Sequence, residues 1–218
     1  MEPHEHEHEH EHADLPGSVA LRAKALQSLL IAKGVIDQST IDRMIDAYEH
    51  RIGPHLGAQV VAKAWVDSAF KAALLEDGTV AVLGLGMPGW RKGARLVVLE
   101  NTQEVHNVVV CTLCSCYPSS LLGLPPVWYK SAPFRSRTVI EPRSVLGEFG
   151  TDVSEDVEVR VWDSNSEVRY LVLPERPKGT QGWSEEQLAT LVNRNAMIGV
   201  ERARNPLVST GGTAGGAA

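Results

Sequence analysis

The chain carries all three of its cysteines within six residues, Cys111-Thr-Leu-Cys114-Ser-Cys116, and none elsewhere. Thiolates are soft, strongly donating metal ligands, and three of them on one short loop reach a single ion without distant segments being brought together. Cysteines that served only to fill a core would instead be scattered along the chain. The spacing therefore predicts a metal-binding loop, and we call residues 111–116 the claw.

The sequence lacks the remaining ligands of a structural zinc site. Such a site takes four tetrahedral side-chain ligands, but the chain has no second Cys-x-x-Cys pair and no histidine after the claw. His106 precedes Cys111 by five residues, and we do not expect it to be a ligand. The tight end of the claw would instead bring the backbone nitrogens of Ser115 and Cys116 close to the ion, and a trivalent metal is acidic enough to displace their protons. Three sulfurs and two nitrogens leave one position open, which favours hydrolysis or hydration at a Lewis acid.

Several segments in and around the claw carry a resemblance to a known family: Val108-Val-Val-Cys-Thr-Leu-Cys-Ser-Cys-Tyr-Pro118, Leu122-Gly-Leu-Pro-Pro126, Trp128-Tyr-Lys-Ser131, Arg135-Ser-Arg137 and Val161-Trp-Asp-Ser164. Together they resemble the α subunit of nitrile hydratase. The resemblance extends from about Ile52-Gly-Pro-His-Leu-Gly57 to Met197-Ile-Gly-Val200. Members with Thr at the second claw position generally hold non-corrin Co(III), and those with Ser there generally hold Fe(III). Thr112 therefore implies one Co(III) ion per chain.

The resemblance also implies a role for each residue of the claw. Cys111 would be the unmodified axial thiolate, Cys114 would be oxidised to sulfinic acid and Cys116 to sulfenic acid. The amide nitrogens of Ser115 and Cys116 would complete the ligand set. A nitrile would bind Co(III), and the sulfenate oxygen of Cys116, or water activated by it, would attack the nitrile carbon to give the amide. Cys116, Cys114 and Ser115 are thus the expected catalytic residues.

The same resemblance implies protein partners. Two arginines of a β subunit would hold the oxidised sulfurs, in an αβ or α2β2 assembly, and a maturation protein would load the cobalt. This chain by itself would be inactive. Arg135, Arg137 and Arg169 are expected to form ion pairs beside the site or with another chain.

The residues just after the claw depart from the family pattern. Most members continue with Trp-Pro after Tyr117-Pro118, whereas this chain has Ser119 and Ser120. Loss of the indole predicts a wider or more polar substrate pocket, lined by Tyr117, Ser119 and Ser120. The alternative is a drifted loop with little effect on substrates.

Two other functions remain open. A subunit resembling thiocyanate hydrolase would share the claw but differ in the residues after it. A non-catalytic zinc-binding or assembly protein would keep the claw with unoxidised cysteines. Turnover of an aliphatic nitrile, turnover of thiocyanate and the identity of the bound metal separate the three.

The remainder of the chain predicts an α+β fold, in which an N-terminal helical arm precedes a layered α/β catalytic domain. Residues 1–17 form a low-complexity tail of alternating His and Glu, either a native cobalt-handling extension or a purification tag. Residues 18–79 form the helical arm that contacts the partner subunit, 80–205 the metal-binding catalytic domain, and 206–218 a flexible tail.

Hydrophobic periodicity places the individual elements. Helical spacing is found at Leu26, Leu29 and Leu30, and at Ile41, Met44, Ile45 and Tyr48, where Ser39 is the expected cap. A third helix is predicted over 58–76, with a break near Asp67. From about Val80 onward the pattern indicates strands, at 96–99, 105–110, 138–140, 157–162 and 168–173. A closing helix is predicted from Ser184, which forms a capping box with Gln187, to about Arg194.

Composition limits the partners and the location of the chain. Its 218 residues are 43% hydrophobic, which is enough for a sizeable core. A net charge of −6 argues against binding to nucleic acid or to anionic membranes. The longest apolar runs are only a few residues, and the N-terminus does not resemble a signal peptide, so we expect a cytoplasmic protein.

Overall fold

The structure of this chain is a computed structural model that describes residues 18–47, 51–87 and 94–207. It divides into two compact units, Met1–Asp46 and Ala47–Ala218. The first unit holds two helices, and the second holds the claw and all of the described strands. Within the described ranges, no helix combines the length and the apolar composition needed to cross a bilayer.

The first unit confirms the two predicted helices and corrects the cap between them. α1 spans Ser18–Ala32 and α2 spans Gln38–Asp46, while Tyr48 lies outside the described residues. Ser39 is wrong as the cap because it lies inside α2. The cap is Asp37, whose carboxylate accepts the backbone N–H of Thr40 at 2.8 Å. Hydrogen bonds from Ser39 and Thr40 lower the pKa of Asp37 to about 2.

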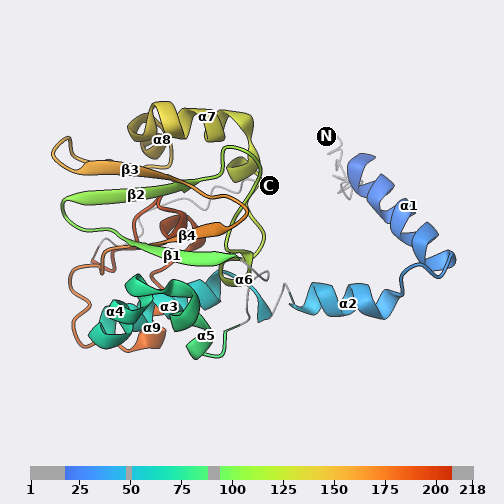
Figure 1. Cartoon of the computed structure of the whole chain (residues 1–218), viewed down its shortest axis with the longest axis horizontal. Coiled ribbons are helices and arrows are strands. Elements are labelled where there is room, and N and C mark those ends of the chain that lie inside the picture. Colours follow the sequence, from blue (N-terminus) through green and yellow to red (C-terminus); the bar gives the residue numbers. More distant parts are fainter. Residues whose placement is uncertain (1–17, 48–50, 88–93, 208–218) are drawn as a thin grey trace, which may run out of the picture. The chain divides into compact units, whose positions relative to one another are not determined.

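The second unit is built on two pairs of parallel strands (Figure 1). β1 (Arg95–Glu100) pairs with β4 (Val168–Leu173), and β2 (Val105–Val110) pairs with β3 (Glu158–Asp163). Four of the five predicted strands are confirmed to within one residue, because their β-branched runs match buried or half-buried positions of the sheets. A parallel pair needs a long crossover between its strands. In β2–β3 that crossover contains the claw.

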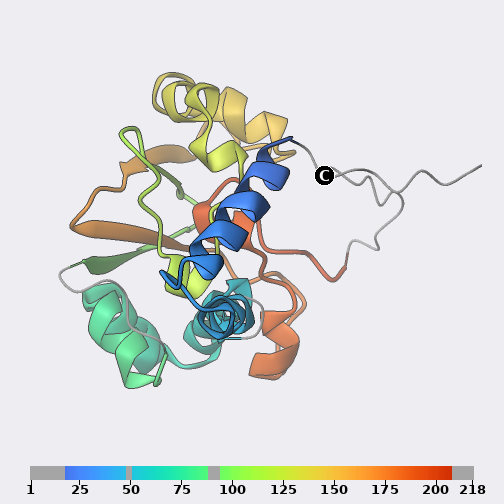
Figure 2. The ribbon, with the colours of Figure 1, turned by 90° about the vertical axis from the view of Figure 1, so that its right-hand side faces the viewer.

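Helices cover the strands on two sides (Figures 1 and 2). One layer consists of α3 (Pro54–Val66), α4 (Ser68–Glu76), α5 (Gly78–Gly84) and α9 (Glu185–Ala189), and the other of α7 (Ala132–Ile140) and α8 (Pro142–Glu148). α10 (Arg194–Ile198) packs against β4, and the short α6 (Ser119–Leu122) packs against α3. The structure is therefore of mixed helix and strand, as predicted. The assignment of residues 18–79 to an arm that contacts a partner stays a prediction.

The break predicted near Asp67 is confirmed, but the onset of strands at Val80 is wrong. Asp67 separates α3 from α4 and accepts the backbone N–H of Phe70 at 2.9 Å. Asp77 repeats this arrangement for α5, accepting the N–H of Val80 at 3.0 Å. The composition of residues 78–84 favours a strand, but the side chain of Asp77 caps a further helix there instead.

Two other element predictions are corrected. The strand predicted at 138–140 is the end of α7, where the hydroxyl of Thr138 donates to the carbonyl of Phe134 one turn earlier. The capping box of Ser184 and Gln187 is confirmed, but its helix α9 ends at Ala189. α10 then begins separately at Arg194, because the side chain of Asn193 caps it. The closing helix is therefore shorter than predicted, and the separately capped α10 follows it.

A close backbone contact joins α10 to β2. Gly199 ends α10 with φ 89°, and a Cβ at this position would lie 2.0 Å from the carbonyl oxygen of Asn107. His106, on the same strand, donates through Nε2 to the carbonyl of Gly199 at 2.7 Å. Burial lowers the pKa of His106, so its ring is held neutral. His106 is therefore a buried residue whose Nε2 is engaged by this hydrogen bond.

Candidate metal centre

The claw begins where β2 ends, as the sequence predicted. Val110 is the last residue of β2, and in the parallel register its partner is Asp163, the last residue of β3. Cys111 follows Val110 directly and is completely buried in the main hydrophobic core. Cys114 is exposed and Cys116 is half-buried. The claw thus leaves the carboxyl end of a buried strand and ends at the surface.

The three thiols converge. Their sulfur atoms all lie within 4.8 Å of one another, and among the described residues they form the one cluster of this kind suited to a metal ion. The Sγ atoms of Cys111 and Cys114 are 3.4 Å apart, and those of Cys114 and Cys116 are 3.0 Å apart. With sulfur about 2.3 Å from an ion, as in zinc sites, two sulfurs are separated by about 3.3 Å at a right angle and about 3.8 Å at the tetrahedral angle. The observed spacings are short enough for the sulfurs to bind one ion together.

Backbone N–H groups face the same cluster. The N–H of Cys114 donates to the sulfur of Cys111 at 3.3 Å. Hydrogen bonds from the thiols of Cys116 and Cys111, and from the backbone N–H groups of Cys116 and Ser115, lower the pKa of Cys114 to about 7. Burial, together with the neighbouring Cys114, raises the pKa of Cys116 to about 12. The two shifts are opposite because the hydrogen bond from the Cys116 thiol favours the thiolate of Cys114, whereas Cys116 is the more buried of the two and lies beside that sulfur.

A carboxylate across the β2–β3 pair holds the first turn of the claw. Oδ1 of Asp163 accepts the backbone N–H of Thr112 at 2.9 Å, and Oδ2 accepts its hydroxyl at 2.5 Å. Asp163 lies 51 residues after Thr112, so no local pattern in the sequence pairs the two residues. Asp163 directly follows a predicted strand, as does the claw. This could have indicated their contact only if the parallel pairing of β2 and β3 had been known. Asp163 orients the turn between Cys111 and Cys114.

Replacing Asp163 with Asn is expected to weaken metal binding by the claw. The amide keeps the size of the side chain, but it has only one acceptor oxygen for the two donors of Thr112. Loss of a partner that orients a metal ligand typically costs about 10–100-fold in metal affinity, and we expect a loss in that range. Chelator competition with the cobalt-loaded protein measures it. Asp156→Asn, at a surface turn where Ser154 donates to the carboxylate, is the matched control. Equal cobalt affinity in the two variants would contradict the assignment.

Aromatic side chains support the other end of the claw. Tyr129, in a 3-10 turn (Trp128–Lys130), is fully buried and donates its hydroxyl to the carbonyl of Cys116 at 3.0 Å. The ring of Tyr117 lies 5.3 Å from that of Tyr129, and its hydroxyl donates to the carbonyl of Leu122. Burial raises the pKa of both phenols, so they remain neutral donors. This packing limits movement of the backbone at Cys116.

The structure separates the three residues expected to line a substrate pocket. Ser119 is exposed at the start of α6, three residues after Cys116. Ser120 and Tyr117 are buried, and the hydroxyl of Ser120 has no hydrogen-bond partner among the described residues. Of the three, only Ser119 presents its side chain to the surface.

The three arginines expected beside the site differ in their contacts. Arg137 pairs with Glu141 and Glu148, both at 2.6 Å, within this chain. Arg169 acts on the claw through its charge, which opposes the rise in the pKa of Cys116. Arg135 reaches the claw directly, where Nη1 donates to the carbonyl of Cys114 at 3.4 Å.

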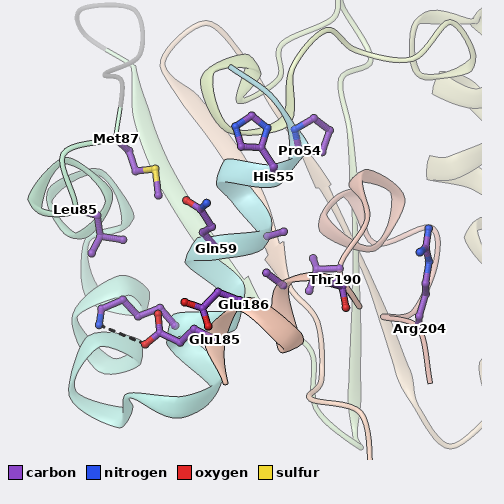
Figure 3. A pocket seen from close by; sticks show the side chains of 13 residues that line it. Pro54, His55, Gln59, Leu85, Met87, Glu185, Glu186, Thr190 and Arg204 are labelled. Atoms are coloured by element: carbon purple, nitrogen blue, oxygen red, sulfur yellow. Dashed lines mark ion pairs between the residues drawn. The ribbon is translucent and has the colours of Figure 1, made fainter. Parts of the chain in front are cut away.

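A cavity of about 710 Å³ lies apart from these contacts, among α3, α5 and α9 (Figure 3). His55 and Gln59 on α3 face it, and Lys63 pairs with Glu185 at 4.0 Å at its edge. None of the residues that line it belongs to the claw. The claw instead lies at the surface, where Leu113 between its cysteines is 86% exposed.

Comparison with known protein sequences gives a consistent set of relatives. A family model described as nitrile hydratase, alpha chain, matches residues 17–201. The chain is 56% identical over 192 residues to the cobalt-containing nitrile hydratase subunit alpha of Pseudonocardia thermophila, covering 88% of this chain and 94% of that one. It is 43% identical over 186 residues to the thiocyanate hydrolase subunit gamma of Thiobacillus thioparus, covering 81% and 76%.

Solved structures show the same relationship. A double mutant of the Fe-type nitrile hydratase from Comamonas testosteroni Ni1 matches with a TM-score of 0.81 at 42% identity, covering 92% of this chain and 98% of that one. A recombinant thiocyanate hydrolase with partially modified cobalt centres matches with a TM-score of 0.76 at 39% identity, covering 88% and 93%. These matches extend beyond the claw to most of the described elements.

Proposed function

The chain belongs to the nitrile hydratase α-chain family, and from that premise we propose that it is the α subunit of a cobalt nitrile hydratase, which hydrates nitriles to amides. The observation that carries this is the convergence of the three thiols at the end of β2, in a chain 53–56% identical to cobalt-containing α subunits. Thr112 in the claw agrees with cobalt.

The donor set of the claw fits one non-corrin Co(III) ion per chain. The sulfurs of Cys111, Cys114 and Cys116 and the amide nitrogens of Ser115 and Cys116 would hold it, and the closeness of the three sulfurs supports a single ion. When bound, the ion supplies Lewis acidity that polarises a nitrile. Asp163 and Tyr129 keep the donors in place from either end of the claw.

Burial of the cysteines agrees with their proposed oxidation. Oxidation of a thiol requires exposure, and Cys111 is buried whereas Cys114 is exposed and Cys116 is half-buried. The family resemblance implies that Cys111 would remain a thiolate, Cys114 would become a sulfinate and Cys116 a sulfenate, and the burial of Cys111 agrees with its part in this assignment. The Cys116 oxygen, or a water molecule it orients, would attack the nitrile carbon, and the sum of the steps adds one water to the nitrile.

Exposed apolar side chains support a β subunit that covers the claw. Leu113 and Val127 are 86% and 83% exposed, and Leu124 is 61% exposed. Isolated apolar side chains are common on surfaces, but three such side chains in the claw and in the segment that follows it favour an interface. The partner would supply the cations that bind the oxidised sulfurs, in an αβ or α2β2 assembly.

Exposed residues on α1 and α2 support a wider contact with the same partner. Leu26, Leu29 and Met44 are between 52% and 58% exposed. The N-terminal helices would therefore bury these side chains against the β subunit. A maturation protein that loads cobalt, and a cytoplasmic location, stay predictions from the sequence.

Metal analysis joined to mass spectrometry tests the proposed function. The chain is purified together with its β subunit, and the fragment containing residues 111–116 is weighed. We expect about one cobalt per chain, two added oxygens on Cys114 and one on Cys116, and turnover of an aliphatic nitrile. Zinc with three free thiols, and no nitrile turnover after cobalt loading, would refute the proposal.

Thiocyanate hydrolysis is the second candidate. The 43% identity to a thiocyanate hydrolase subunit, and the cobalt in a solved relative of that kind, favour it as the alternative. The identity to nitrile hydratase α subunits is higher, at 53–56%. Parallel assays with thiocyanate and with an aliphatic nitrile distinguish the two, and we expect the nitrile to be preferred.

Ser119 is proposed to widen the entrance to the site. Replacing it with Trp is expected to lower kcat/KM for a bulky aromatic nitrile relative to acetonitrile by roughly tenfold, since misfit of a few atoms in a pocket costs about 1–3 kcal/mol. Steady-state kinetics with both substrates measure the ratio. Val80→Trp, at an exposed position on α5, controls for the added indole. A ratio unchanged in Ser119→Trp would show that this position does not select substrates.

A further inference from the structure

Arg135 makes an unusual contact with the claw. It lies in the first turns of α7, and its Nη1 donates to the carbonyl oxygen of Cys114 at 3.4 Å. Its Nε is buried and has no hydrogen-bond partner among the described residues. A buried donor without a partner is costly in a folded protein and calls for an explanation. The guanidinium is held beside the claw with part of its donor capacity unused.

The contacted oxygen belongs to the same peptide group as the nitrogen of Ser115. Resonance delocalises electrons over the oxygen, carbon and nitrogen of a peptide group. If a metal holds the deprotonated nitrogen of Ser115, the negative charge is therefore shared with the carbonyl oxygen of Cys114. A cation that donates a hydrogen bond to that oxygen stabilises the charge, and such charge-assisted bonds are about twice as strong as neutral ones.

Tyr129 provides an internal comparison. It donates to the carbonyl of Cys116, at 3.0 Å. That carbonyl shares its peptide group with the nitrogen of Tyr117, which is not among the proposed ligands. A neutral phenol lies at the carbonyl that carries no extra charge, whereas a guanidinium lies at the carbonyl that would carry it. The charged donor, Arg135, therefore contacts the carbonyl oxygen that would become negative, and the neutral donor, Tyr129, contacts the one that would stay neutral.

We propose that Arg135 is a positioning residue of the metal centre, which retains the ion by compensating negative charge at the Cys114 carbonyl oxygen. This inference rests on the proposed function, because the charge arises only when a metal binds the nitrogen of Ser115. If the inference holds, this chain supplies one positively charged side chain next to the metal, in addition to those expected from the β subunit.

Cobalt retention in matched variants tests the proposal. The α chain with its β subunit is prepared as wild type, Arg135→Gln, Arg135→Lys and Arg137→Gln, and cobalt loss to a chelator is followed by elemental analysis. Arg135→Gln is expected to lose cobalt roughly tenfold faster than wild type, in the range for supporting groups around a metal. Arg135→Lys keeps the charge and is expected to stay within about threefold of wild type. Arg137→Gln removes the pairs with Glu141 and Glu148 and a hydrogen bond to Ser144, none of which reaches the claw, and should match wild type.

Each outcome is decisive. Loss from Arg135→Gln at the wild-type rate would overturn the proposal, and so would equal loss from Arg135→Lys and Arg135→Gln, because contact and not charge would then matter. If Arg135→Gln does not fold, Arg135→Lys decides: retention near wild type supports charge compensation, and tenfold faster loss overturns it. A wild-type complex without cobalt would refute the proposed function itself, and the inference with it.

Discussion

Replacing Cys111 with Ala is expected to leave the complex without cobalt and to lower the rate of nitrile hydration by at least about 1000-fold. The reason is that the Lewis acid lowers the activation barrier by several kcal/mol. Cys111 is the buried member of the claw, and its sulfur lies 3.4 Å from that of Cys114. Without it, the two remaining thiols are on the exposed end of a loop that has lost its anchor in the core. Elemental analysis and a nitrile assay on the same preparation measure both effects.

Val110→Ala is the matched control for this variant. Val110 directly precedes Cys111, is equally buried and has no metal-binding atom. Its truncation is expected to cost about 1–3 kcal/mol of stability through lost burial and a small cavity, while cobalt is retained. If Cys111→Ala kept a full complement of cobalt, the claw would not be the metal site.

Replacing Gly199 with Ala is expected to destabilise the chain by more than about 4 kcal/mol, a value that is exceptional for a single substitution. The residue has φ 89°, and the new Cβ would lie 2.0 Å from the carbonyl oxygen of Asn107. Neither backbone can move cheaply, because Asn107 is on β2 and His106 beside it donates to Gly199. Displacement of β2 would also shift the claw, so cobalt occupancy should fall as well.

Gly182→Ala separates the two causes of the lost stability, which are the left-handed backbone conformation and the contact of the new Cβ with Asn107. Gly182 has nearly the same backbone angle, φ 79°, but nothing lies within 4 Å of its missing Cβ. The control therefore carries only the cost of the left-handed conformation, about 1–2 kcal/mol. Thermal unfolding of both variants in the αβ complex gives the comparison. Equal melting temperatures would mean that the contact with Asn107 is not limiting.

Local signals in the sequence were reliable where the decisive atoms are close in the chain. The claw could be found because its three sulfurs come from six consecutive residues, so no folding information was needed to bring them together. The capping box of Ser184 and Gln187 and the four strands were predicted for the same reason, since they depend on spacing of two or three residues. The helical cap at Asp37 and the end of α9 were missed because competing polar side chains lie within a few residues of each boundary.

The segment 138–140 shows where composition misleads. Thr138, Val139 and Ile140 favour a strand by propensity, but Ser131 caps a helix seven residues earlier and the Thr138 hydroxyl is satisfied by the carbonyl of Phe134. Exposure of Val139 and Ile140 at 52% and 81% also shows that no sheet was available to bury them. The helix cap and the lack of a neighbouring strand among the described residues therefore outweigh the weak strand preference of these three residues.

The sequence by itself determined the cluster of three cysteines and the family, because these depend on adjacent side chains and on motifs. Only the tertiary structure decided what holds the claw. Asp163 reaches Thr112 across 51 residues through the parallel register of β2 and β3, and Arg135 reaches Cys114 across 21 residues from α7. Contacts of this kind depend on strand pairing and helix placement, which are set by burial over the whole chain and leave no mark in the spacing of the residues involved.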